Sequence, residues 1–281
     1  MKAMADADRW CRTLLKGHYE NFWVSSPLVP RRLRPHMARV YAYCRSVDDL
    51  GDESRDQADA LGRLDLWRRD VERLFAGNTP AHPVLMALST SVRELHLEAR
   101  PFLDLIDANV QDQRVQSYQE WADVIAYCRL SASPVGRIVL AVFGVADESL
   151  VRFSDDVCNG LQLANFAQDV RVDEGKGRCY LPQAEIAAEG TRGAIRAMCE
   201  QARTLLGSGH QLEAAVPGRL GLQLAMYRLG GEAIVAAVER GGYRTDEVRP
   251  SVPMSAKVRI MLGALWRTRG GGMPPAQEVR S

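Results

Sequence analysis

The chain has 281 residues, of which 46% are hydrophobic, so it is long enough to bury a large core. Its 36 Lys and Arg residues balance 35 Asp and Glu residues, and this balance excludes the broad basic surface typical of nucleic-acid binding. Six cysteines without a CxxC pair, and a polar N-terminus without a signal-peptide run, favour a soluble cytoplasmic protein with reduced thiols.

Helical periodicity dominates the apolar pattern. Apolar residues recur at spacings of three and four near 6–21, 32–50, 55–76, 83–98, 117–131, 148–172, 194–214, 219–240 and 254–268. Breakers such as Gly77, Arg100-Pro101 and Gly144 separate these segments, and alternating strand patterns are scarce. The sequence therefore predicts an all-α chain with one domain over residues 1–269, followed by a tail, 270–281, that we expect to be disordered.

The first chemically informative segment is 41–53, YAYCRSVDDLGDE. On a helix that turns by about 100° per residue, its key polar side chains fall within roughly 60° of one another. They are Tyr41, Arg45, Asp48 and Asp52. An aromatic ring, a cation and two carboxylates therefore share one face, with the carboxylates about 6 Å apart along the axis.

A second segment, 162–173, repeats this spacing on a helix whose flanking residues are apolar. Its polar stripe consists of Gln162, Asn165, Asp169 and Asp173. Such a stripe is costly to bury unless a ligand satisfies it. A Gly-bounded loop follows, and it carries three further polar residues: Lys176, Arg178 and Tyr180.

Each stripe alone could be a solvated helix face with ordinary surface acids. Two stripes in one chain, the second with amides among apolar residues, favour a binding site instead. Oxygen ligands one turn apart suit Mg²⁺, which keeps several waters and bridges to substrate phosphates, whereas zinc would favour His or Cys ligands.

We therefore predict that two facing stripes clamp a diphosphate through several Mg²⁺ ions. The predicted metal ligands are Asp48, Asp52, Asn165, Asp169 and Asp173. Three cations would neutralise the remaining charge as pyrophosphate leaves: Arg45, Lys176 and Arg178.

These residues resemble those of the squalene/phytoene synthases, which are head-to-head trans-prenyltransferases. The likeness runs from about His18 to Lys257. Within it, 41–52 resembles the family's first aspartate motif and 162–182, QLANFAQDVRVDEGKGRCYLP, resembles the second. The resemblance implies a single-domain helical bundle of the isoprenoid-synthase type around a central cavity, with both aspartate motifs at its mouth.

Three stretches are similar to the bacterial hydroxysqualene synthase branch of the hopanoid pathway. Residues 20–26, ENFWVSS, resemble ENFPVAS; residues 127–137, YCRLSASPVGR, resemble YCRLSANPVGR; and residues 172–182, VDEGKGRCYLP, resemble VDWRKGRIYLP. The departures from that pattern are Trp23, Ser133 and Glu174-Gly175. They loosen the substrate assignment and leave the class of chemistry unchanged.

The resemblance implies Mg²⁺-dependent ionisation of presqualene diphosphate, rearrangement of the cation and capture of water to give hydroxysqualene. Presqualene diphosphate, squalene and phytoene synthases, which condense two prenyl diphosphates such as farnesyl diphosphate, stay open as alternatives. The branch ends its reaction with water and the chain has no GxGxxG motif, so we expect no NADPH requirement. An apolar substrate is compatible with peripheral membrane contact, and the sequence does not determine the oligomeric state.

Roles for several side chains follow from the resemblance. We predict catalytic roles for the four aspartates and for Tyr41 and Tyr127. The predicted substrate-binding residues are His18, Phe22, Arg45, Gln162, Asn165, Phe166, Lys176, Arg178 and Tyr180. For His18 a place on the helix surface is an alternative, and the aromatics either fill the core or line a carbocation cavity, since π faces stabilise a cation.

Two other classes of protein fit the sequence less well. A non-catalytic scaffold with this fold would be expected to have eroded aspartate motifs, whereas both motifs are intact. An all-α Mg²⁺-dependent nucleotide pyrophosphohydrolase would carry more carboxylates in its second motif, where this chain has Gln162 and Asn165.

Overall fold

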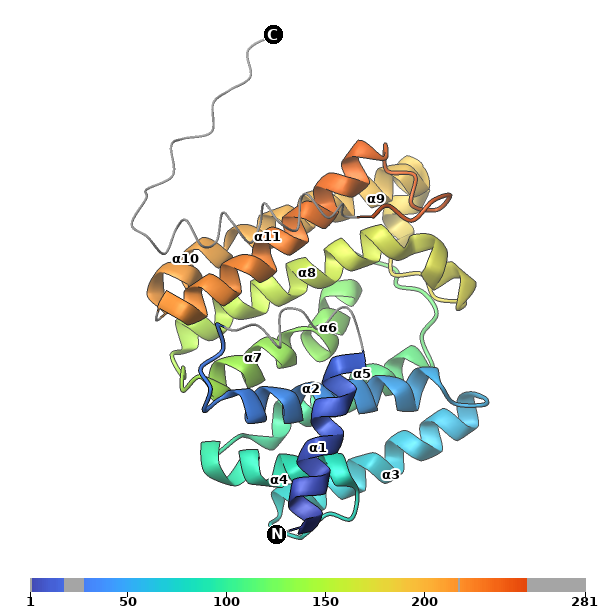
Figure 1. The fold of residues 1–281 in the computed structure, drawn as a ribbon. Coiled ribbons are helices and arrows are strands. Elements are labelled where there is room, and N and C mark those ends of the chain that lie inside the picture. Colours follow the sequence, from blue (N-terminus) through green and yellow to red (C-terminus); the bar gives the residue numbers. More distant parts are fainter. Residues whose placement is uncertain (1, 18–27, 217, 252–281) are drawn as a thin grey trace.

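The structure, a computed structural model, describes residues 2–17, 28–216 and 218–251 (Figure 1). These residues form helices and one isolated parallel β-bridge between Ser117 and Cys179, which confirms the predicted all-α fold. The helices are α1 (Lys2–Gly17), α2 (Arg34–Asp52), α3 (Gln57–Phe75), α4 (Pro83–Leu95), α5 (Ala99–Asp112), α6 (Trp121–Ser131), α7 (Ser133–Val142), α8 (Glu148–Gly175), α9 (Gln183–Gly207), α10 (Gly209–Ala215) and α11 (Gly218–Arg240).

The helices pack as two groups within one domain, with α5, α6 and α7 between them (Figure 1). In one group, α2 packs against α1, α3 and α4 around buried side chains such as Tyr43, Leu64 and Phe102. In the other, α8 packs against α9, α10 and α11 around residues such as Leu163 and Met198. Each predicted acidic stripe therefore belongs to the central helix of a different group.

Two helices, α5 and α7, were absent from the predicted segments. Pro101 lies in the first turn of α5 and Pro134 in the first turn of α7, where a helix needs no backbone N–H donor. Proline there starts a helix rather than separating two segments, so the expected break at Arg100-Pro101 was wrong. The predicted breaks at Gly77 and Gly144 are confirmed, because both glycines have positive φ angles outside helices.

The helix predicted near 194–214 starts earlier and ends earlier than expected. It begins at Gln183 and bends at Gly190, whose φ of 72° is readily adopted only by glycine. The helix predicted near 254–268 and the tail at 270–281 lie outside the described residues.

All six cysteines are free thiols, as the sequence predicted. One stretch, Trp121–Val142, is apolar and long enough to cross a membrane, but more than half of it is buried in the fold. It comprises α6 and α7, which pack against α5 and α8. This stretch therefore serves as part of the helical core.

Candidate active site

The first aspartate of the predicted metal site, Asp48, lies near the C-terminal end of α2. Its side chain is open to solvent, yet atoms of the surrounding helices crowd its carboxyl group and raise its pKa to about 6. Asn109 of α5 donates a hydrogen bond to it over 3.4 Å. A Cβ atom at Gly51 would lie 2.6 Å from the Asn109 oxygen, so the glycine allows this close approach of α5.

Asp52, the last residue of α2, connects the two sequence motifs. Lys176 Nζ lies 2.9 Å from one of its oxygens and an Arg178 guanidinium nitrogen lies 3.2 Å from the other. Burial alone would raise the pKa of Asp52, but these two cations outweigh it and hold the pKa below its usual value. The loop after α8 thus lies directly against the end of α2.

Tyr41 and Arg45 of the first stripe are both half-buried. Arg45 forms an ion pair with Asp49 at 2.6 Å and lies 3.8 Å from Glu53. The Arg45 guanidinium is therefore engaged by acids on α2 and directly after it, whereas Asp52 pairs with the cations of the loop after α8.

The second stripe is partly accessible, whereas the residues beside it in the middle of α8 are mostly buried. Asn165 is exposed and Gln162 is half-buried, although their neighbours Leu163, Ala164 and Phe166 are buried. Helices α7, α9, α10 and α11 pack against α8 and cover its apolar faces. The polar stripe is therefore left accessible, as a ligand-binding face requires.

Asp169 interrupts α8 with φ −103° and ψ 15°, which are not helical values. Its carboxylate forms an ion pair with Arg249, and Gln168 donates a hydrogen bond of 2.8 Å to the carbonyl of Pro250. The segment that follows α11 therefore packs against the kink. One turn later, burial and the nearby charge of Asp169 raise the pKa of Asp173 to about 6.

The loop after α8 is held by a reversal of the chain at Gly177. This residue has φ +74°, and the next N–H, of Arg178, donates to the carbonyl of Asp173 over 2.9 Å, a common helix C-terminal motif. Cys179 N–H then donates to the carbonyl of Gln116 over 2.7 Å. These backbone bonds fix Arg178 and the following residues beside the loop between α5 and α6.

Four aromatic side chains form one buried cluster around Asp112: Tyr118, Tyr127, Phe166 and Tyr180. Asp112 was not among the site residues predicted from the sequence. Tyr127 and Tyr180 donate hydrogen bonds of 2.7 Å and 2.9 Å to its two oxygens. Phe166 and Tyr118 both stack on Tyr180, with ring centroids 4.0 Å and 5.8 Å from its ring. A prediction of helix α5 could have pointed to Asp112, because Asn109 and Asp112 lie one turn apart on this helix.

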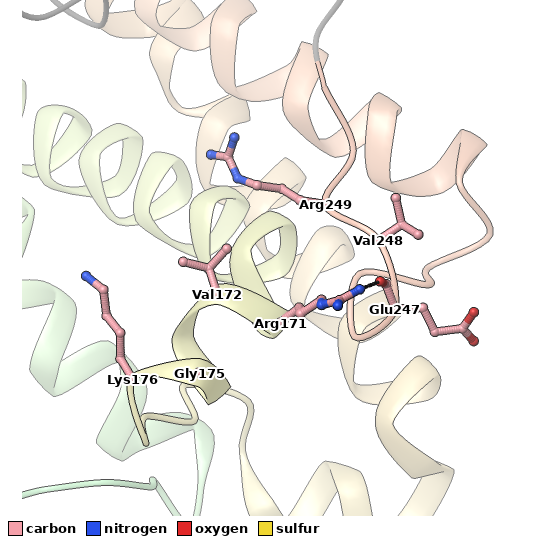
Figure 2. Close-up of a pocket in the computed structure, with 7 residues that line it drawn as sticks. All are labelled: Arg171, Val172, Gly175, Lys176, Glu247, Val248 and Arg249. Carbon is pink, nitrogen blue, oxygen red and sulfur yellow. Dashed lines mark hydrogen bonds between the residues drawn. The ribbon is translucent and has the colours of Figure 1, made fainter.

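An open hollow of about 620 Å³ lies beside the C-terminal turns of α8 (Figure 2). Lys176 and Arg249 extend to the same side of these turns, with Val172 between them, while Arg171 turns away to the backbone of Glu247. Lys176 and Arg249 are the side chains that pair with Asp52 and Asp169. The hollow therefore adjoins both aspartate motifs.

The residues present fit Mg²⁺ by their chemistry. Asp48 and Asp173 have raised pKa values because their surroundings disfavour the negative charge, and a bound cation would offset this. Over the described part of the chain, no three acidic, His or Cys side chains are already gathered as a complete metal site. The metal-ligand assignment therefore stays a prediction, as do the substrate roles of His18 and Phe22, which lie outside the described residues.

The chain matches the squalene/phytoene synthase family over residues 15–256. A hydroxysqualene synthase from Rhodopseudomonas palustris is 32% identical over 237 residues, covering 78% of this chain and 80% of that protein. A presqualene diphosphate synthase from the same organism is 33% identical over 164 residues, which is 58% of each protein and thus less than two thirds of that relative.

Solved structures agree with the family match. The squalene synthase HpnC from Alicyclobacillus acidocaldarius is 43% identical, with a TM-score of 0.80 over 85% of this chain and 95% of that one. A dehydrosqualene synthase shares the fold at 20% identity, with a TM-score of 0.83 over 96% of this chain and 99% of that one. The chain therefore belongs to the squalene/phytoene synthase family.

Proposed function

We propose that this protein ionises presqualene diphosphate and converts the resulting carbocation, with water, into hydroxysqualene and pyrophosphate. The observation that carries this proposal is the meeting of the two aspartate motifs, since Lys176 and Arg178 after α8 pair with Asp52 of α2. The long alignment with the hydroxysqualene synthase is compatible with this product. The three branch-like stretches of the sequence support it as well.

Each group has a role that its chemistry allows. The carboxylates of Asp48, Asp52, Asp169 and Asp173 would hold Mg²⁺, which when bound supplies positive charge to the diphosphate leaving group. Lys176 and Arg178 stand where they can neutralise the departing pyrophosphate. In the metal-free protein, Asp52 holds both cations at the site before the substrate arrives.

A second candidate is condensation of two prenyl diphosphates, as in a presqualene diphosphate, squalene or phytoene synthase. The alignment with the presqualene diphosphate synthase favours keeping this candidate, although it covers less of the chain. Both candidates use the same metal-assisted loss of pyrophosphate. They differ in the substrate accepted and in the fate of the cation.

Product analysis by mass spectrometry separates the candidates. The protein is incubated with Mg²⁺ in ¹⁸O-water and with presqualene, farnesyl or geranylgeranyl diphosphate in turn. We expect ¹⁸O-labelled hydroxysqualene from presqualene diphosphate, formed without NADPH. Squalene formed only with NADPH and without labelled alcohol, or a condensation product from the other two substrates, would overturn the proposal in favour of the second candidate.

A further inference from the structure

Asp112 is a nearly buried carboxylate whose two oxygens are held by two phenols. Its side chain is 11% exposed, and Tyr127 and Tyr180 each donate a hydrogen bond to a separate oxygen. An Arg178 nitrogen lies 4.0 Å away, at the limit of an ion pair, and points chiefly to Asp52. The negative charge of Asp112 is thus shared mainly with two aromatic rings.

These rings belong to one continuous aromatic cluster. The ring centroid of Tyr127 lies 5.3 Å from that of Tyr180 and 6.1 Å from that of Phe166, and the stacked rings of Phe166 and Tyr180 are nearly parallel, with an interplanar angle of 5°. Phe166 directly follows Asn165, the exposed amide of the polar stripe on α8. Arg178 links the cluster to the aspartate motifs, since one of its nitrogens lies 3.2 Å from Asp52 and 4.0 Å from Asp112.

A phenol that donates to a carboxylate gains electron density in its ring, because the O–H bond is polarised toward oxygen. A richer π system attracts a cation more strongly, and burial limits the screening of the carboxylate charge by water. A prenyl cation formed beside this cluster would therefore experience a negative potential. The apolar chain of the substrate carries no charge, so this potential would not repel it.

The arrangement is poorly explained by stability alone. Burial raises the pKa of Asp112, so the ionised carboxylate is disfavoured by its surroundings despite its hydrogen bonds. An apolar residue in this cluster would avoid that penalty. Asp112 is also not arranged as a metal ligand, since a phenol takes each of its oxygens.

We propose that Asp112 is a positioning residue that, through Tyr127 and Tyr180, orients and polarises the aromatic cluster so that it stabilises the carbocation. The inference rests on the proposed function, because it requires a prenyl cation to form. Asp112, which lies outside both aspartate motifs, would thus act on the carbocation that forms as pyrophosphate leaves. The metal clamp, by contrast, acts on the leaving group.

The first test compares Asp112→Asn with Asp107→Asn, a matched change on the same helix at a carboxylate that pairs with Arg68. The probes are farnesyl dimethylamine, whose protonated form mimics the prenyl carbocation, and farnesyl methyl ether, which is neutral. Each is measured with Mg²⁺ and inorganic pyrophosphate. We expect Asp112→Asn to weaken amine binding at least about tenfold, since the charge behind the rings is lost. Ether binding, pyrophosphate binding and all properties of Asp107→Asn should stay within about twofold.

Tyr127→Phe and Tyr180→Phe keep both rings and remove one donor each, so they test the idea even if Asp112→Asn folds poorly. With the prenyl diphosphate that wild type turns over, each should lower kcat about tenfold or more with KM changed less than about threefold. A wild type that ionises no prenyl diphosphate would defeat the proposed function. An active wild type whose Asp112 and Tyr variants retain its kcat and its preference for amine over ether would defeat only this inference.

Discussion

Arg249 donates hydrogen bonds from its guanidinium to both carboxylate oxygens of Asp169, the second at 3.2 Å. A cation from the segment after α11 therefore lies on an aspartate that we predict to bind Mg²⁺. Asp52 is paired in the same way with Lys176. Without metal, two of the four predicted carboxylate ligands are thus balanced by the protein's own cations.

This pairing predicts that Arg249 competes with Mg²⁺ for Asp169. In Arg249→Gln the carboxylate is free, so we expect Mg²⁺ to bind about three- to tenfold more tightly in the presence of pyrophosphate. Isothermal titration calorimetry measures this directly. Arg244→Gln is the matched control, because Arg244 lies in the same segment and pairs with Glu247. Equal or weaker Mg²⁺ binding in Arg249→Gln would show that the pair does not compete with the metal.

The raised pKa of Asp48 predicts a trade-off between stability and function. Because this pKa is about 6 in the folded chain and lower when unfolded, the ionised carboxylate destabilises the metal-free fold. With allowance for its exposure, Asp48→Asn should stabilise the metal-free protein by about 1 kcal/mol, or roughly 2 °C in Tm, at pH 7.5. The variant should nevertheless lose activity.

The pH dependence of this difference is the decisive part. The stability difference should be full at pH values well above 6 and should shrink as the pH falls, vanishing below about pH 4, where Asp48 is protonated in both states. Thermal unfolding of wild type and Asp48→Asn in EDTA across this range measures it. A constant difference in Tm at all pH values would mean that the charge of Asp48 is not its cause.

Gly177 should be required for its backbone conformation. A Cβ atom there would meet no atom within 4 Å, but the φ of +74° is strained for any other residue. We expect Gly177→Ala to destabilise the fold by about 1 kcal/mol and to misplace Arg178. Gly175→Ala is the control, since it adds the same methyl group to open space at a helical position. Chemical denaturation that gave equal stability for the two variants would contradict the prediction.

Much of the site could be predicted from local sequence because each stripe lies on one helix. Asp48 and Asp52 are one turn apart on α2, and Asn165 is exposed on α8, as the periodicity of the sequence implied. The spacing argument could not include the bend at Asp169. That bend coincides with contacts to Arg249 and Pro250, which are far away in the chain.

Other features depend on packing between helices and left little local signal. Helix α5 was not predicted, so neither Asn109 nor Asp112 could be assigned to a face. The hydrogen bonds of Asp112 come from α6 and from the loop after α8, and no spacing rule links those segments. Partners that meet only through the tertiary fold are therefore the part that sequence reasoning missed.

We propose that the two aspartate motifs together hold one Mg²⁺–diphosphate cluster. Asp48→Asn and Asp169→Asn remove a carboxylate from each motif, and each should lower turnover at least about a hundredfold without disrupting the fold.

The most direct measurement is Mg²⁺-dependent release of pyrophosphate from presqualene diphosphate by wild type, both single variants and the double variant. The double variant should lose little more turnover than either single variant, because both groups serve one cluster. Losses that simply multiply in the double variant, or a single variant with wild-type turnover at limiting Mg²⁺, would contradict it.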